Sequence, residues 1–188
     1  MFSMGRISGV DRPALATVMP TEKSPTIVVD VGAKGDCKPL HLFQFGLMAD
    51  AYAKDILGRQ SPKIGLLSIG EEEGKGNTLV KEAFDFFKMA QNVNFVGNVE
   101  GRDLFTGDVD IMVCDGFVGN VVLKLSEGRS PSLSTILKRE LLSSTLEAKI
   151  GTFLNKGAFK RFSRFLDYAD YDGAPLLGFH GIVIVSHG

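Results

Sequence analysis

The sequence has few of the features that mark disulfide-stapled, membrane-spanning or strongly basic proteins. Its 188 residues include two cysteines, Cys37 and Cys114, too few for a disulfide framework. No apolar run approaches the roughly 18 residues of a membrane-spanning helix, and residues 1–13 lack the apolar core of a signal peptide. With 21 basic and 22 acidic residues, the net charge of -1 gives no basis for non-specific nucleic-acid binding. These absences favour a cytoplasmic protein with no nucleic-acid partner.

Several motifs for nucleotide, metal and hydrolase sites are also missing. Gly70 and Gly74 enclose only three residues, and Lys75 is followed by Gly76, so the segment is not a Walker loop. No G-x-G-x-x-G joins a predicted strand to a helix, and no G-x-S-x-G marks a serine nucleophile. The three histidines and two cysteines lack the spacing of zinc ligands. The sequence therefore predicts no metal and no cofactor.

What is present is enough for one globular domain over residues 1–188, because 44% of the residues are hydrophobic and 22 are glycine. Short runs rich in Val and Ile predict strands buried on both faces. They are residues 26–31, 63–69, 93–99, 109–115 and 181–186. Residues 38–58 and 78–90 carry apolar side chains at helical spacing, with Pro39 suited to a first turn and Gly58 to a stop. This alternation predicts an α/β fold, a mainly parallel sheet with helices on both faces.

Glycine beside polar residues follows each predicted strand. The segments are DVGAKGD, GEEEGKGN, GNVEG, DGFVGN and SHG. Ligands of open parallel sheets bind beyond the carboxyl ends of the strands, and glycine lets backbone N–H groups close on an anion. One interpretation is a phosphate site at this edge. The alternative is that the glycines only form tight turns between strands and helices.

Long ordered blocks of the sequence carry a family resemblance. They are DRPALATVMPT, VVDVGAKGDCKPLHL, IGEEEGKGNTLVKEA, NFVGNVEGRDLFTGDVDIMVCDGFVGNVVLKLSEG and GAPLLGFHGIVIVSHG. In this order they resemble the PlsX family, the bacterial phosphate acyltransferases of phospholipid synthesis. The resemblance implies a fold similar to isocitrate and isopropylmalate dehydrogenases. It also implies transfer of a fatty acyl group from acyl carrier protein to inorganic phosphate, in a homodimer that associates peripherally with the membrane.

The resemblance also predicts that residues 1–188 are a fragment of a longer enzyme. Members of the family begin with a strand and a DAMGGD loop and continue beyond SHG with a terminal helix, and neither segment occurs here. The alternative is a catalytically inactive remnant that retains only dimer or membrane contacts. An NAD-dependent dehydrogenase of the same fold is disfavoured, because the acidic residues do not form the cluster that its divalent metal needs.

The family motif G-K-G-N falls on Gly74, Lys75, Gly76 and Asn77. Phosphate can itself attack a thioester, so the protein has to supply orientation and charge rather than a nucleophile. Lys75 is the candidate for stabilising phosphate or the developing oxyanion, and Asn77 is expected to cap the following helix. The glutamates of residues 71–73 are expected to face solvent or pair with lysines.

The remaining candidates lie after the fourth and fifth predicted strands. Asn120 is the second catalytic candidate, as an amide donor to phosphate or to the thioester oxygen. Asp115 and Gly119 are phosphate-site candidates, and Asp115 either orients Asn120 or a neighbour or forms a turn after the strand. His187 ends the last predicted strand and could reach the crevice, although a turn role fits it nearly as well.

Residues 129–172 are expected to form a helical excursion with a basic, amphipathic segment at 148–172. Its candidate contact residues are Lys149, Phe153, Lys160, Arg161, Phe162 and Arg164. Three readings stay open: packing on the core or a dimer partner, docking of the acidic carrier protein, and residence at an anionic membrane surface.

Overall fold

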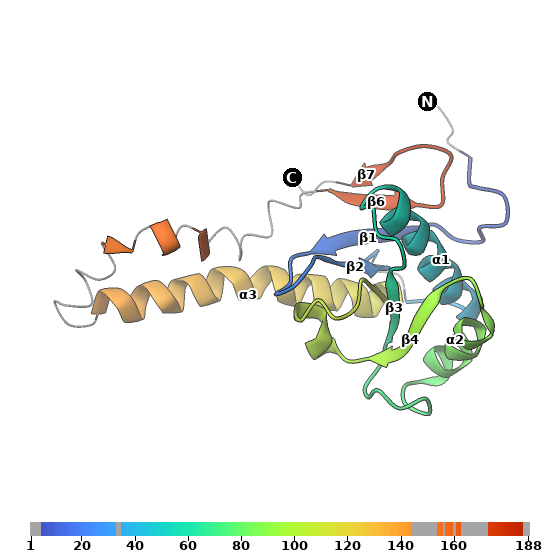
Figure 1. The fold of residues 1–188 in the computed structure, drawn as a ribbon, viewed down its shortest axis with the longest axis horizontal. Helices are drawn as coiled ribbons and strands as arrows, with labels where there is room; N and C mark the ends of the chain where they lie inside the picture. Colours follow the sequence, from blue (N-terminus) through green and yellow to red (C-terminus); the bar gives the residue numbers. More distant parts are fainter. Residues whose placement is uncertain are drawn as a thin grey trace.

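In the computed structural model (Figure 1), which describes residues 5–32, 35–143, 154–155, 157–159, 161–162 and 173–185, seven strands form one sheet. The strands are β1 (Ala14–Met19), β2 (Thr26–Val29), β3 (Lys63–Leu67), β4 (Asn94–Val99), β5 (Ile111–Val113), β6 (Ala174–Leu177) and β7 (Ile184–Val185). Their order in the sheet is β4-β3-β5-β2-β1-β6-β7. The two edges of the sheet are therefore β4 and β7.

The sheet is mixed, which corrects the prediction of a mainly parallel one. Strands β2, β5, β3 and β4 pair in parallel, as the sequence predicts. The pairs β1–β2, β1–β6 and β6–β7 are antiparallel. The sequence predicted neither β1 nor β6 as a strand, because ALATVM and APLL contain Ala and Pro instead of a Val and Ile run. Pairing with neighbouring strands, rather than β-propensity, fixes these segments in the sheet.

Two helices, α1 (Pro39–Asp55) and α2 (Thr78–Met89), cover one face of the sheet. Buried side chains of the parallel strands pack there against Phe45 of α1 and Phe87 of α2. Gly46 of α1 permits the close approach of the two helices, because a Cβ at this position would lie 2.5 Å from Cζ of Phe87. Both helices lie within the ranges that the sequence predicts.

The opposite face is covered by the 3-10 helix η1 (Gly101–Phe105) and the first turns of α3 (Gly116–Ser143). Leu104 and Leu123 from these helices belong to one buried cluster with Val28 and Met112 of the sheet. Strands β2 and β5 are consequently buried on both faces, as their continuous apolar runs predict.

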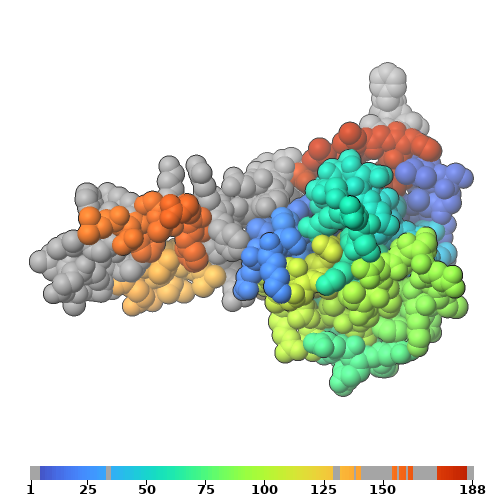
Figure 2. Space-filling model, viewed as in Figure 1, coloured from blue at the N-terminus to red at the C-terminus, as the bar shows by residue number. Residues whose placement is uncertain are grey.

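Helix α3 is long and extends beyond the sheet. It contains 28 residues, and its far end lies away from the sheet and helices α1 and α2 (Figures 1 and 2). The excursion predicted to begin at residue 129 therefore includes the second half of a helix that starts at Gly116, directly after β5. Among the residues that the structure describes, no helix combines the length and hydrophobicity that crossing a membrane requires.

Candidate functional site

The carboxyl ends of the four parallel strands bring four of the predicted loops to one edge of the sheet. Because β4, β3, β5 and β2 are neighbours that run in the same direction, their exit loops lie next to one another. The loop with Lys75 follows β3, and the segment from Asp115 to Asn120 follows β5. The sheet order thus places the two predicted catalytic residues on adjacent exits.

The fifth predicted loop does not share this edge. Strand β7 is antiparallel to β6, β6 is antiparallel to β1, and β1 is antiparallel to β2. Strand β7 therefore runs against β2, and its carboxyl end points to the opposite edge. His187 itself lies outside the described residues, so its role at the crevice stays a prediction that the direction of β7 disfavours.

Lys75 is held in an exposed turn that depends on two glycines. A Cβ on Gly70 would lie 3.0 Å from Cγ of Lys75, so the stem of the lysine runs close over Gly70. Gly76 has a φ of 99°, and a Cβ there would lie 2.8 Å from Cγ1 of Val80 and 2.9 Å from Oγ of Ser68. A larger residue at position 76 would be strained and would displace the turn from the start of α2.

Asn77 caps helix α2, as the sequence predicts. Its side-chain oxygen accepts a hydrogen bond from the N–H of Val80 at 2.9 Å. The first N–H groups of a helix lack intrahelical acceptors and form the positive end of its dipole. A lysine directly before such an end is suited to bind an anion.

Two of the three glutamates beside Lys75 are engaged by cations, as expected. Glu73 pairs with Lys88 at 2.6 Å, and Glu71 pairs with Arg102 at 3.3 Å. The hydrogen bond that Lys88 donates to Glu73, together with the negative charge of Glu73, raises the pKa of Lys88. These pairs reduce the repulsion that the acidic loop would otherwise exert on a bound anion.

Asp115 caps α3 in the same way. Its Oδ1 accepts hydrogen bonds from the N–H groups of Phe117 at 2.9 Å and Val118 at 3.0 Å. This is the turn-forming role that the sequence left open for Asp115, and an additional role toward Asn120 stays a prediction. Gly119 serves close packing, because a Cβ there would lie 1.9 Å from the carbonyl oxygen of Asp30.

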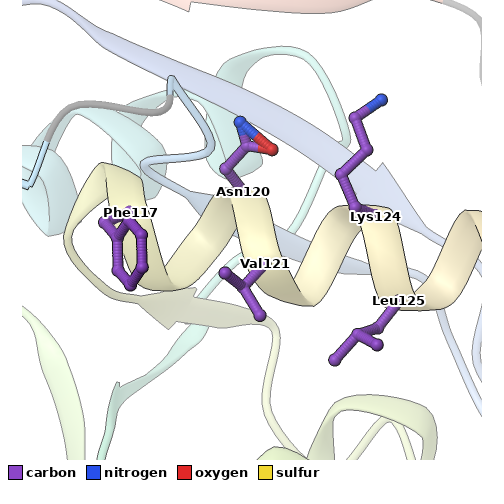
Figure 3. A pocket seen from close by; sticks show the side chains of 5 residues that line it. All are labelled: Phe117, Asn120, Val121, Lys124 and Leu125. Atoms are coloured by element: carbon purple, nitrogen blue, oxygen red, sulfur yellow. The ribbon is translucent and has the colours of Figure 1, made fainter.

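Asn120 lines a groove of about 530 Å³ along the first turns of α3. Figure 3 shows Phe117, Val121 and Leu125 in a row on one side of the helix, while Asn120 and Lys124 point to another side. Phe117 and Leu125 are 63% and 69% exposed, which is unusual for large apolar side chains at helical spacing. The groove thus combines an apolar wall with an amide and a cation.

Asp30 is a buried acid at this edge that the site prediction did not include. It directly follows β2, and its Oδ1 accepts hydrogen bonds from the N–H groups of Leu15 and Gly32, each at 2.9 Å. Burial raises its pKa. The signal in the sequence was the Asp in VVDVG, an acid at the end of an apolar run.

The basic segment is only partly described. Arg161 and Phe162 are helical and exposed. The other predicted contact residues lie outside the described part of the chain; they are Lys149, Phe153, Lys160 and Arg164. Within that described part, no cluster of three or more His, Cys, Asp or Glu is placed to hold a metal ion.

Comparison with known proteins gives a family match over the entire chain. Residues 1–188 match the family described as "Fatty acid synthesis protein". The chain belongs to this family. It is 71% identical over 188 residues to the phosphate acyltransferase of Nitratidesulfovibrio vulgaris and 68% identical to that of Lawsonia intracellularis. The match covers 100% of this chain and 54% of each relative, so the chain spans about half the length of the family members it matches.

Solved structures show a shared fold at low sequence identity. The EutD phosphotransacetylase from Staphylococcus aureus superposes with a TM-score of 0.54 at 16% identity, covering 67% of this chain and 44% of that one. A phosphotransacetylase from Streptococcus pyogenes gives 0.53 at 16% identity, covering 66% and 44%. These similarities concern the fold alone. The similarity to isocitrate dehydrogenases stays a prediction.

Proposed function

We propose that the protein is a phosphate acyltransferase, which moves a fatty acyl group from acyl carrier protein to inorganic phosphate to give acyl phosphate for phospholipid synthesis. Membership of the family and the names of its relatives support this reaction. The observation that carries it is the position of Lys75 next to the capped N-terminus of α2, at the carboxyl edge of the parallel strands. A phosphate held there needs no further cofactor.

In this reaction an oxygen of phosphate attacks the carbonyl carbon of the thioester. A C–O bond forms, the C–S bond breaks, and the sulfur leaves as the thiolate of the carrier. Lys75 stabilises the phosphate or the oxyanion of the tetrahedral intermediate. Asn120, on the neighbouring exit, donates its amide to phosphate or to the thioester oxygen. Holding both reactants in line supplies a large part of the rate enhancement.

The apolar row on α3 is the place we assign to the acyl chain. Phe117 and Leu125 are eight positions apart, about 12 Å along a helix at 1.5 Å per residue. That length is suited to an extended chain of several methylene groups. Asn120 lies on the same part of α3, on another side of the helix (Figure 3). Contact with the chain would remove exposed apolar surface from water.

The partners and location follow from the same assignment. We propose a cytoplasmic homodimer that uses acyl carrier protein as acyl donor and contacts anionic membrane peripherally. Support for the membrane contact comes from the basic, phenylalanine-rich composition of residues 148–172 and from the exposure of Arg161 and Phe162.

The decisive experiment is Lys75→Ala in the full-length protein. We expect acyl-phosphate formation to fall about 100-fold or more, the scale of removing one preorganised charge-stabilising group. Lys81→Ala is the matched control, because Lys81 is an exposed lysine on α2, six residues after Lys75 and outside the G-K-G-N motif. A Lys75→Ala protein with normal turnover and an unchanged circular dichroism spectrum would refute the role of Lys75.

The acyl groove has a separate test in Leu125→Ser. We expect kcat/KM to fall about 5-fold for a long-chain acyl carrier substrate but to stay nearly constant for a short-chain one, because only the long chain reaches Leu125. The control is Met89→Ser on α2, since Met89 is 71% exposed and Leu125 is 69% exposed. Equal losses with both substrates would place the acyl chain elsewhere.

A further inference from the structure

The turn that carries Lys75 rests on an asparagine from the neighbouring strand. The carbonyl oxygen of Glu72 accepts a hydrogen bond from the N–H of Lys75 at 2.9 Å, which closes the turn. The same oxygen accepts a second hydrogen bond, at 2.8 Å, from Nδ2 of Asn98. Asn98 lies on β4, and its side chain therefore links the turn to the rigid sheet.

This link differs from the other side-chain contacts of the loop. Asn98 is 5% exposed, whereas the side chains of the pairs Glu73–Lys88 and Glu71–Arg102 are more than half exposed. Exposed ion pairs contribute little and weaken with salt. A buried amide bonded to a backbone carbonyl is shielded from competing water. Among the described residues, Asn98 is thus the most buried side chain that attaches the loop to the sheet.

The orientation of the Asn98 amide shows that its N–H group, rather than its oxygen, is the atom that contacts the turn. With Nδ2 on Glu72, the Oδ1 atom of Asn98 is buried and has no hydrogen-bond partner among the described residues. The flipped amide would place Oδ1 against the carbonyl oxygen of Glu72, two acceptors facing each other. The hydrogen bond that Asn98 donates to Glu72 is therefore the interaction that fixes the orientation of this side chain.

We propose that Asn98 is a positioning residue that holds the Glu72–Lys75 turn and thereby places the Lys75 ammonium for phosphate. The role of Lys75 in this inference rests on the proposed function. The attachment of the turn by Asn98 does not depend on it. The proposal gives β4 a role in positioning Lys75. The sequence does not indicate this role, because Asn98 lies 23 residues after Lys75.

The attachment is tested by trypsin cleavage after Lys75 in the full-length protein, with mass spectrometry to identify the cut. In Asn98→Ala we expect the rate of this cut to rise about 5- to 30-fold, the change in open population expected for losing one hydrogen bond from a buried amide. Asn94→Ala is a matched control, because Asn94 donates its amide to the carbonyl of Ser61 from the other end of β4. Equal cleavage in the two variants would overturn the proposal.

Asn98→Asp gives a second variant of nearly the same shape. Its carboxylate lacks the N–H donor and would face the carbonyl of Glu72, so we expect loop cleavage at least as fast as in Asn98→Ala. Thermal unfolding of both variants identifies any that fail to fold, and the folded one is used. A folded Asn98→Asp protein with wild-type cleavage after Lys75 would contradict the attachment.

Action through Lys75 is tested by a double-mutant cycle on acyl-phosphate formation. We expect Asn98→Ala to lower kcat/KM for phosphate about 10-fold in the wild-type background and by less than about 2-fold when Lys75 is already Ala. Additive losses would show that Asn98 does not act through Lys75 and would overturn the positioning role. If Lys75→Ala alone left turnover normal, the role proposed for Lys75 would fail, while the trypsin result would still decide whether Asn98 holds the turn.

Discussion

Asp30 shows how one buried carboxylate organises the junction between two strands. It directly follows β2, and its Oδ1 receives the N–H groups of Leu15 on β1 and of Gly32 in the exit loop. Burial opposes ionisation and raises the pKa of the carboxyl group, while the two backbone hydrogen bonds lower it. Asp30 therefore stabilises the fold as a hydrogen-bond acceptor, although the burial of its negative charge is unfavourable.

Replacing Asp30 separates these two properties. Asp30→Ala is expected to lower the free energy of unfolding by about 2–3 kcal/mol, because the N–H groups of Leu15 and Gly32 lose the acceptor that this buried side chain supplies. Asp30→Asn keeps an oxygen in place and is expected to cost less. Urea denaturation of the full-length proteins gives both values, and equal losses in the two variants would show that the charge, rather than the acceptor, matters.

The raised pKa of Asp30 also predicts the direction of a pH effect. The folded state binds this proton more tightly than the unfolded state, so the carboxylate destabilises the fold above its folded pKa and this penalty disappears as pH falls. Wild type should therefore gain stability relative to Asp30→Asn between about pH 7 and about pH 4. A stability difference that is constant over this interval would contradict the assignment.

At the scale of elements, the start of α3 is fixed by contact with the end of β2. Gly119 faces the carbonyl oxygen of Asp30, where a Cβ would lie 1.9 Å away. Only a glycine lets the first turn of α3 lie this close to the sheet. Asn120, the next residue, is placed at the carboxyl edge by the same contact.

Gly119→Ala and Gly128→Ala should have opposite effects, although both glycines lie within α3. We expect Gly119→Ala to lower stability by about 1–3 kcal/mol, as overpacking does. Gly128 has no atoms within 4 Å of a built Cβ, so Gly128→Ala should raise stability by about 0.5–1 kcal/mol through helix propensity. Thermal and urea unfolding measure both, and destabilisation by Gly128→Ala would contradict its exposed position in the helix.

At the scale of the whole molecule, the far end of α3 and the described residues of the basic segment, 154–155, 157–159 and 161–162, lie away from the proposed chemical site (Figures 1 and 2). This separation allows surface binding and catalysis to be changed independently. Phe162 is 44% exposed and stands next to Arg161. An exposed aromatic side chain beside a cation is suited to the headgroup region of an anionic bilayer.

Phe162→Glu is therefore expected to release the full-length protein from anionic vesicles in a sedimentation assay. Turnover with a soluble acyl carrier substrate should stay substantially intact, because carrier docking depends mainly on the cations. Phe153→Glu is expected to act in the same way if residue 153 shares this surface. Vesicle binding that survives the changes, or variants that unfold, would assign the phenylalanines to a packed interface instead.

Local patterns in the sequence were sufficient for the central part of the fold. The Val and Ile runs predicted β2 to β5, because a strand buried on both faces has a continuous run of apolar residues. Helical spacing predicted α1 and α2, because a helix buried on one side has apolar residues every three or four positions. The cap of α2 by Asn77 was predictable for the same reason, since a cap bonds to a residue three positions away. The glycines around Lys75 were also visible as a motif.

What the sequence did not determine depends on partners far apart in the chain. Strands β1 and β6 are strands because they pair with neighbours, and the reversed direction of β7 follows from those pairings. The contact of Gly119 with Asp30 and the hydrogen bond from Asn98 to the Lys75 turn also join separate elements. No local period encodes such contacts, because their free energy exists only once the sheet has assembled. The sequence by itself thus determined which loops combine glycine with polar residues, and only the tertiary structure decided which of these loops meet.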